Sequence, residues 1–530
     1  MTDTPSDIGS ENRSAQTQRS LADYFEAIRA ADVSAVSVVT PLQRADVLSE
    51  RLGNEVLLKR EDQQAIFSFK CRGAYHRISR LVADSDGGLR GVIAASAGNH
   101  AQGVALAARK LGLPAVIVMP VTTPPIKVAS VRRLGAEVVL YGDDFDEALA
   151  RSLVLGSERG LAYIHPFDDP DTIVGQGTVG RELAAQLESP PTALFTCVGG
   201  GGLAAGVGAY LHGLGWPTEH YGVEDAEAAC MAAALRAGRP VALERVGLFA
   251  DGAAVRVAGE ETLRVCIATG LRPLEVTADE IAAAIKDIFV DTRTVVEPAG
   301  ALGLAGLKRY VAEHDARGEV LVAIVSGANV NFDRLRHVIE LTEVGGEHEC
   351  LFAVTIPEQP GSFLAFSEVL GKRAITEFNY RRAAGTRAQV FVGVKVSEGP
   401  SECARLLRHL TAAGYDVADL TQDETARLHI RHTIGGRLPE GGVGEYRERL
   451  FRFQFPERPG ALRQFLRAMD RAWDITLFHY RNHGAAFGRT LVGMTVPATT
   501  TDEDIAAFAG ELGYPFSEET DSEVYARFLR

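Results

Sequence analysis

The chain has 530 residues, too many for a single hydrophobic core, and this length predicts about three domains. Its hydrophobic content of 46% and charged content of 23% are typical of a soluble globular protein. A net charge of −14 without a basic stripe argues against nucleic-acid binding. No apolar run reaches the roughly 18–20 residues that span a membrane. Residues 1–20 are polar and predict a disordered tail, not a signal peptide.

Six cysteines are scattered along the chain without a CxxC pair. In so long a chain this pattern predicts reduced thiols, and it argues against a disulfide framework or a zinc site. With no signal peptide, we expect a cytoplasmic protein. The six are Cys71, Cys197, Cys230, Cys266, Cys350 and Cys403.

From about residue 20 to 345, short β-rich runs alternate with Ala- and Leu-rich helical patterns. Such alternation predicts doubly wound α/β folding, with parallel sheets covered by helices on both faces. Ligands in these folds bind beyond the carboxyl ends of the strands. The predicted strands are 91–96, 115–119, 137–141, 193–198 and 320–325, and the predicted helices are 102–111, 128–134 and 203–214.

Residues 68–75 (SFKCRGAY) contain one lysine, Lys70, in a chain with only eight lysines and 47 arginines. Arginine would supply an ordinary surface cation here. Lysine has instead a primary amine that can lose its proton when desolvated and form an imine with a carbonyl. This favours a lysine that binds pyridoxal phosphate as a Schiff base. An equally weighted alternative from this segment alone is a lysine whose stem packs under Phe69 while its ammonium reaches water.

Residues 96–102 (SAGNHAQ) join a predicted strand to a predicted helix. Ser96 and the backbone of Ala97, Gly98 and His100 are candidates for binding a substrate carboxylate, and Asn99 can donate to an oxygen. Simple helix capping by the polar side chains is the favoured alternative from this motif alone. Residues 325–329 (VSGAN) form a later junction of the same kind, and simple helix capping is the alternative there too.

Four successive glycines at 199–202 also join a strand to a helix. Glycine lets the backbone approach an anion closely, and a helix N-terminus directs N–H groups at it, so the motif predicts a phosphate site. No Gly-Lys-Ser/Thr follows, which excludes a nucleotide P-loop. Gly200, Gly202 and Ala205 satisfy a dinucleotide fingerprint, and Glu224 stands where a ribose-binding acid would. From this motif alone a dehydrogenase or a purely structural loop stays possible.

The sequence after about residue 345 contains a duplication. Residues 349–361 recur at 448–460 with an offset of 99, and residues 378–381 (FNYR) recur at 478–481 (FHYR) with an offset of 100. Two matches at nearly one offset indicate a repeated module. Each copy predicts a small α+β unit with a strand, a Pro-Gly turn, a helix and a second strand. The predicted helices are 363–371 and 462–470, and the predicted linker is 435–445.

Seven ordered motifs of residues 20–345 resemble those of the fold-type II pyridoxal-phosphate enzymes, whose fold is like that of the tryptophan synthase β-subunit, and most closely the threonine dehydratases. The duplicated tail resembles the paired ACT-like regulatory domains of the long, biosynthetic members. This predicts a tail at 1–20, a catalytic region of two lobes at 21–345, and regulatory domains at 346–435 and 446–530. The motifs are KRED at 59–62, SFKCRGAY at 68–75, SAGNHAQG at 96–103, GQGT at 175–178, GGGGLAAG at 199–206, EPAGALGLAG at 297–306 and SGAN at 326–329.

The resemblance implies a role for each matching residue. Lys70 holds the cofactor and acts as the catalytic base, Asn99 bonds its ring oxygen, and Ser326 shares a hydrogen bond with its ring nitrogen. A monovalent cation near Glu224 is also possible. The cofactor's phosphate binds Gly199, Gly200, Gly201, Gly202 and Leu203.

The implied reaction is β-elimination of L-threonine to 2-oxobutanoate and ammonia, the first committed step of isoleucine biosynthesis. Isoleucine would inhibit the enzyme, and valine would oppose this inhibition. The expected assembly is a homotetramer. Serine racemases place a second serine where Ala97 stands, so racemisation is not expected. The alternatives are a degradative serine/threonine dehydratase, whose short type lacks the tail, and an amino-acid sensor with an inactive catalytic region. The first candidates for the effector site are Tyr380, Arg381, Tyr480 and Arg481. The alternative is that they are ordinary strand residues.

Overall fold

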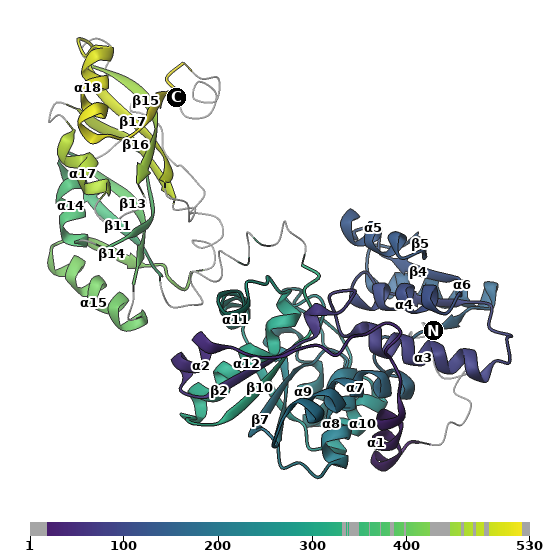
Figure 1. The fold of residues 1–530 in the computed structure, drawn as a ribbon. Coiled ribbons are helices and arrows are strands. Elements are labelled where there is room, and N and C mark those ends of the chain that lie inside the picture. Colours follow the sequence, from purple (N-terminus) through teal and green to yellow (C-terminus); the bar gives the residue numbers. More distant parts are fainter. Residues whose placement is uncertain are drawn as a thin grey trace, which may run out of the picture. The chain divides into compact units, whose positions relative to one another are not determined.

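The computed structural model divides into two compact units, Met1–Ile339 and Glu340–Arg530, which we describe separately (Figure 1). Residues 1–17 and 424–445, which include most of the predicted tail and the whole predicted linker, lie outside the described residues. The structure describes residues 18–330, 335, 338, 349–359, 361–371, 373–381, 386–396, 399–423, 446–456, 461–469, 473–481 and 487–521.

The larger sheet of the first unit is parallel except at one edge. Its central strands are runs of buried Val, Ile, Leu and Ala, as expected for a sheet covered on both faces. The edge strand β1 pairs antiparallel with β2, a feature that the alternating pattern did not predict. The sheet order is β1 (Leu42–Arg44), β2 (Glu55–Arg60), β10 (Val320–Val325), β7 (Ala193–Cys197), β8 (Glu219–Asp225) and β9 (Arg272–Val276).

The smaller sheet of the first unit is fully parallel. Successive residues of its strands point to opposite faces, so that Val92 and Ala94 belong to the core under α4 (Asn99–Lys110) while Ile93 packs toward α6 (Phe145–Arg159). The prediction of parallel sheets with helices on both faces is therefore confirmed. The sheet order is β5 (Glu137–Leu140), β4 (Ala115–Met119), β3 (Val92–Ala95) and β6 (Ala162–Tyr163).

Helices of the first unit follow the strands in the predicted order. Those predicted at 102–111, 128–134 and 203–214 correspond to α4, α5 and α8. The helices are α1 (Leu21–Ala30), α2 (Asp46–Leu52), α3 (Lys70–Asp84), α4 (Asn99–Lys110), α5 (Pro125–Arg133), α6 (Phe145–Arg159), α7 (Pro170–Gln186), α8 (Gly202–Gly213), α9 (Cys230–Ala237), α10 (Glu260–Ala268), α11 (Ala278–Thr292) and α12 (Pro298–His314), with short 3-10 turns η2 (Glu61–Gln63) and η3 (Ala226–Ala228). No helix in the described ranges is long and apolar enough to cross a membrane.

A network of buried charges fastens the start of α3 to β2 and α7. Arg72 donates through Nε to Glu61 Oε2 at 2.8 Å and through Nη1 to Glu182 Oε1 at 2.7 Å. Lys59 Nζ donates to Glu182 Oε2 at 2.7 Å. Burial acts to raise the pKa of Glu61, but the adjacent Arg72 guanidinium more than offsets this, so the pKa lies below its ordinary value. The carboxylate therefore stays charged in the interior.

The second unit is one antiparallel sheet that both repeats share. The repeats meet where β12 pairs with β16, and Asn379 lies opposite His479 in the middle of that pairing. Phe378 lies opposite Tyr480 and Tyr380 opposite Phe478, so equivalent positions exchange partners across the pairing. The sheet order is β14 (Asp416–Asp419), β11 (Glu349–Pro357), β13 (Arg387–Lys395), β12 (Ile375–Arg381), β16 (Asp474–Arg481), β17 (Phe487–Pro497), β15 (Tyr446–Pro456) and β18 (Phe516–Glu518).

The helices of the second unit cover one face of this sheet (Figure 1). Their apolar sides and the inward residues of the strands form one core that runs through both repeats. The duplicated α+β architecture predicted from the sequence is confirmed. The helices are α14 (Ser362–Leu370), α15 (Gly399–Ala412), α17 (Ala461–Ala468) and α18 (Asp502–Leu512).

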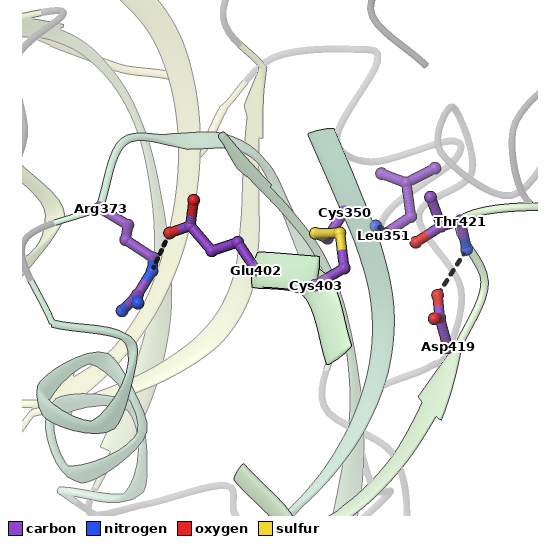
Figure 2. The surroundings of a disulfide bond; sticks show 7 residues. All are labelled: Cys350, Leu351, Arg373, Glu402, Cys403, Asp419 and Thr421. Carbon is purple, nitrogen blue, oxygen red and sulfur yellow. Dashed lines mark hydrogen bonds and ion pairs between the residues drawn. A yellow bond between two sulfur atoms is a disulfide. The ribbon is translucent and has the colours of Figure 1, made fainter. Parts of the chain in front are cut away.

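The prediction that all cysteines are reduced thiols is wrong for one pair. Cys350 in β11 and Cys403 in α15 form a disulfide, with Cα atoms 5.8 Å apart and a sequence separation of 53 residues (Figure 2). This wide spacing carries no signal in the sequence, and only the packing of the helix on the strand brings the two sulfur atoms together. The other four cysteines are free and buried.

Replacing Arg72 with Met should lower the free energy of unfolding by about 3–5 kcal/mol, because it leaves the Glu61 carboxylate buried without its countercharge. Urea unfolding followed by circular dichroism measures the change. Arg80 lies on the same helix in an exposed pair with Asp84, so Arg80→Met should cost less than about 1 kcal/mol. Equal losses in the two variants would show that the buried network does not stabilise the fold.

Candidate active site

Lys70 is the first residue of α3 and lies in a partly buried position. Its Nζ donates to the Pro166 carbonyl at 3.0 Å, and desolvation lowers the pKa of the amine to about 8. A lowered pKa increases the neutral, nucleophilic fraction of the amine near neutral pH. The side chain does not take the alternative geometry of an ammonium reaching into water, since it ends against a backbone carbonyl.

The short segment after β6 joins Lys70 to the glycine loop. Pro166 accepts from the Lys70 amine, and the next residue, Phe167, packs on Gly200. A Cβ atom at Gly200 would lie 2.3 Å from the Phe167 ring, so a side chain there cannot be accommodated. The glycine at this position is therefore required by the close approach of the two segments.

Residues 199–203 span the end of the turn after β7 and the first two residues of α8, which begins at Gly202. The first amides of an α-helix have no acceptor within the helix, and they carry the positive end of its dipole. Thr262 Oγ1 donates to the Gly200 carbonyl at 2.6 Å, so the loop is held by Thr262 as well as by Phe167. The turn thus presents backbone N–H groups of the kind that bind a phosphate.

Ser326 directly follows β10 and lies close to the lysine. Its carbonyl accepts from the Phe69 amide at 3.3 Å, next to Lys70 in the chain. Its hydroxyl is buried and donates to the Ala299 carbonyl at 3.2 Å. Cys197, the last residue of β7, also neighbours Ser326 and Lys70, and burial raises the pKa of its thiol to about 11. Cys197 had no predicted role.

Asn99, the first residue of α4, is held by two side chains. Its Nδ2 donates to Glu297 Oε1 at 2.6 Å, and its Oδ1 accepts from Asn329 Nδ2, also at 2.6 Å. Glu297 is buried, and desolvation raises its pKa to about 7. Glu297 and Asn329 lie in the EPAGALGLAG and SGAN motifs, but no role was predicted for either residue. Their contacts with Asn99 join positions 198 and 230 residues apart in the chain, so no local pattern marked them.

The predicted carboxylate-binding residues occupy the turn between β3 and α4. Ser96 Oγ accepts from the Gly98 amide at 3.2 Å, and Gly98 is the N-terminal cap of α4. His100 is buried with Nε2 2.9 Å from the Ile164 carbonyl, and desolvation lowers its pKa to about 3. His100 is therefore neutral, and Ala97 completes the turn. This turn and Lys70 both reach residues 164–166.

Glu224 is buried at the end of β8, and desolvation raises its pKa to about 7. Its two carboxyl oxygens accept from the amides of Met231 and Ala232 at 2.8 and 2.7 Å, so that it caps the start of α9. Among the described residues, no group of three or more His, Cys, Asp and Glu side chains is arranged to hold a metal ion. The cation site stays a prediction.

The effector candidates lie in the paired central strands of the second unit. Tyr380 is buried in β12, and its hydroxyl donates to Glu358 Oε1 at 2.6 Å. Tyr480 lies in β16 and lines a small pocket between the two repeats. The backbones of Arg381 and Arg481 end these strands, but their side chains lie outside the described part of the structure.

The site residues fit pyridoxal phosphate. An amine of lowered pKa can form an imine with its aldehyde, and the glycine-lined start of α8 can take its phosphate. The buried Ser326 hydroxyl and the oriented Asn99 amide offer uncharged hydrogen-bonding groups for the ring. The fold brings Lys70, residues 199–203 and Ser326 together at the carboxyl ends of β7 and β10, where ligands of such sheets bind.

Two family patterns match the chain, one in each unit. The family described as pyridoxal-phosphate-dependent enzyme matches residues 33–327. The C-terminal regulatory domain of threonine dehydratase matches twice, at residues 340–430 and 440–529. Together these matches span almost the whole chain.

Curated relatives are similar over nearly their full length. The biosynthetic L-threonine dehydratase IlvA of Pasteurella multocida is 49% identical over 512 residues, which are 96% of this chain and 98% of the relative. The protein of the same name from Escherichia coli is 47% identical over 508 residues, 96% of this chain and 97% of the relative.

Solved structures resemble the first unit. The processed form of threonine deaminase isoform 2 from Solanum lycopersicum superposes with a TM-score of 0.58 and 47% identity, covering 61% of this chain and 93% of that one. Maize serine racemase superposes with a TM-score of 0.55 and 30% identity, covering 59% of this chain and 96% of its own.

Glu297→Gln should flatten the pH dependence of stability in cofactor-free protein. The pKa of Glu297 is raised on folding from an ordinary 4.5 to about 7. Its protonated form therefore stabilises the fold below about pH 4.5, and this contribution, up to about 3 kcal/mol, is lost as the pH rises through about 7. Gln keeps an oxygen for Asn99 but does not titrate.

Urea unfolding at a series of pH values between 4 and 8 measures this effect. Glu297→Ala, which also does not titrate but removes the acceptor of Asn99, separates the loss of charge from the loss of the hydrogen bond. Parallel stability profiles for wild type and Glu297→Gln would contradict the assignment of this titration to Glu297.

Proposed function

The chain belongs to the biosynthetic threonine dehydratases, which are pyridoxal-phosphate-dependent lyases, and we propose that it converts L-threonine to 2-oxobutanoate and ammonia as the first committed step of isoleucine biosynthesis. The predicted family, fold class and cofactor are thereby confirmed. Inhibition by isoleucine, opposition by valine, assembly as a homotetramer and a cytoplasmic location stay predictions.

The observation that carries the proposal is the placement of the Lys70 amine. It lies at the start of α3, its pKa is lowered to about 8, and it contacts the same short segment that packs on the glycine loop. The loop would hold the phosphate of the cofactor, and the Lys70 amine would supply the nitrogen that forms an imine with its aldehyde. No arginine in this position could serve, because a guanidinium does not lose its proton in proteins.

Elimination from threonine needs a base at Cα and a proton for the leaving hydroxyl. Bound pyridoxal phosphate supplies an electron sink for the charge that develops at Cα. Lys70 Nζ would accept the Cα proton. Its pKa of about 8 raises the fraction of neutral amine near neutral pH. The hydroxyl leaves as water, and one water is consumed when ammonia is released.

The side chains of Ser326 and Asn99 offer uncharged hydrogen-bonding groups. Ser326 offers a hydroxyl, which cannot hold a ring nitrogen protonated as a carboxylate would, and this favours prompt loss of the leaving group over side reactions. Glu297 and Asn329 hold the Asn99 amide in one orientation. We propose that the amides of the turn at Ser96–Gly98, next to the N-terminus of α4, bind the substrate carboxylate.

Lys70→Ala should lower kcat for 2-oxobutanoate formation by at least about 10³-fold, because the reaction loses its base and the cofactor its covalent partner. The visible absorbance of the bound cofactor should change with it. Lys110→Ala is a matched control, since Lys110 is exposed at the end of α4, and it should retain full turnover. Multiple turnovers by the Lys70 variant without added amines would contradict the assignment.

Feedback control is proposed for the second unit, where residues of both repeats line one pocket. Apolar side chains from both repeats line it, including Ile375, Phe455 and Leu462. Two arginines line it as well, Arg373 from the first repeat and Arg463 from the second. Apolar walls with cationic groups match a ligand that has an aliphatic side chain and a carboxylate.

Arg463 is the better placed of the two cations for a carboxylate. Its Nη2 donates to the Ser367 carbonyl at 2.8 Å and to the Gly371 carbonyl, which fixes the guanidinium against the first repeat. Within the described ranges, no group accepts a hydrogen bond from its buried Nε. A bound carboxylate would supply the missing acceptor. The neighbouring Tyr480 is the effector candidate that lines this pocket.

Arg463→Gln should raise the isoleucine concentration for half-inhibition by about tenfold or more, since a charge-assisted hydrogen bond contributes about 1.5–3 kcal/mol. Turnover without isoleucine should be unchanged. Arg467 lies one turn later on α17 in an exposed pair with Glu368, and Arg467→Gln should keep the wild-type response. Equal sensitivity of Arg463→Gln and wild type would exclude this pocket as the site of inhibition.

A further inference from the structure

The disulfide ties a helix to the sheet within the first repeat. Cys350 is the second residue of β11 and is fully buried, whereas Cys403 lies near the start of α15 and is 7% exposed. The bond therefore anchors the N-terminal part of α15 to the strand beneath it (Figure 2). Both cysteines belong to the core shared by the repeats.

The second repeat makes the same link without cysteines. An offset of 99 residues places Arg449 at the position of Cys350 and Asp502 at that of Cys403. Arg449 Nη2 donates to Asp502 Oδ1 at 2.7 Å, and Asp502 begins α18. Both repeats thus connect the start of the strand to the start of the helix. Only in the first repeat does the connection depend on the redox state of the protein.

Two residues, Glu402 and Arg373, connect the disulfide to the pocket described above. Glu402 precedes Cys403 in α15, and its Oε1 accepts from Arg373 Nε at 3.3 Å (Figure 2). Arg373 Nη1 also donates to the Leu370 carbonyl at 3.0 Å. These two contacts orient the Arg373 guanidinium, which lines the pocket. The position of α15 relative to the sheet therefore influences one of the two cations that face an effector.

We propose that Cys350 and Cys403 are a reversible thiol-oxidation site that tunes effector binding in the second unit, so that the disulfide form binds isoleucine more tightly than the dithiol form. The bond holds Glu402, and through it Arg373, in the orientation that receives a carboxylate. Reduction frees the start of α15, and the pocket loses this preorganisation. The inference rests on the proposed effector role of the pocket.

The redox step is thiol–disulfide exchange with a small-molecule disulfide such as oxidised glutathione. The thiolate of Cys403, the more accessible sulfur, attacks the S–S bond and releases one thiol. The sulfur of Cys350 then attacks the mixed disulfide, and a second thiol leaves as the internal bond forms. The two protein thiols are oxidised, one disulfide is reduced to two thiols, and the protons of the cysteines end on the released thiols. Reduction is the reverse reaction.

The test uses the full-length holoenzyme equilibrated in buffers of reduced and oxidised glutathione. Acid trapping, alkylation and mass spectrometry measure the fraction of peptides linked through Cys350 and Cys403. Isoleucine inhibition is then measured in both states. We expect half-inhibition to need at least about fivefold more isoleucine in the reduced protein, the lower end of typical coupling between sites.

Two variants and one further measurement separate the possible outcomes. The double variant Cys350→Ser/Cys403→Ser should match the reduced protein in every buffer, while Cys266→Ser, a buried cysteine of the first unit, should respond to glutathione like wild type. Amide hydrogen exchange without isoleucine should show weaker protection of residues 369–375 after reduction. This measurement does not depend on the identity of the effector.

Three results would contradict either the redox inference or the proposed effector role of the pocket. Failure to recover the linked peptide at any glutathione ratio overturns the inference. A linked peptide with identical inhibition and identical exchange in both states also overturns it, since the bond is then only structural. If isoleucine inhibits neither state, the proposed effector role of the pocket is wrong, and the exchange of residues 369–375 alone decides whether the disulfide controls the pocket.

Discussion

The catalytic unit depends on a buried set of paired charges that places α3. Arg72 lies two residues after Lys70, and its guanidinium binds Glu61 and Glu182 in the interior. Isolated charges at these depths would be prohibitively costly, so each side chain is stable only in the presence of its partners. Because one end of the network is on α3 and the others are on β2, η2 and α7, the position of the lysine follows from the satisfaction of these charges.

The site itself is assembled from backbone turns that meet from different elements. Phe67, which precedes the lysine segment, has a left-handed backbone with φ of 54°, uncommon for a bulky residue. Its carbonyl accepts from the Ala328 amide at 2.9 Å, and Ser68 bridges to Gly327. The loop that carries Lys70 is thus clamped to the loop that carries Ser326. Such clamping lets the fold hold a strained conformation next to its reactive amine.

The two halves of the regulatory unit are similar because the module is duplicated, but the two copies differ in the residues that link helix to strand. Pairing of β12 with β16 fuses two modules into one sheet and creates a pocket that neither repeat could form alone. Arginines from both copies then face one cavity. The copies also differ in how each helix is tied to its strand, by a covalent bond in the first and an ion pair in the second. A chemical signal can therefore act on one half of the unit.

The sequence by itself determined the alternation of strands and helices and the duplication, and it singled out Lys70, because these features depend on local periodicity and on short motifs. Strands β4 and β10 were predicted to the residue. Glu297 escaped notice, since its importance lies in a 2.6 Å contact with Asn99, 198 residues away in the chain. The Cys350–Cys403 bond was missed for the same reason, since its two cysteines are 53 residues apart in the chain. Tertiary structure alone decides which distant side chains become neighbours, and contacts of that kind leave no periodic or spaced pattern in the chain.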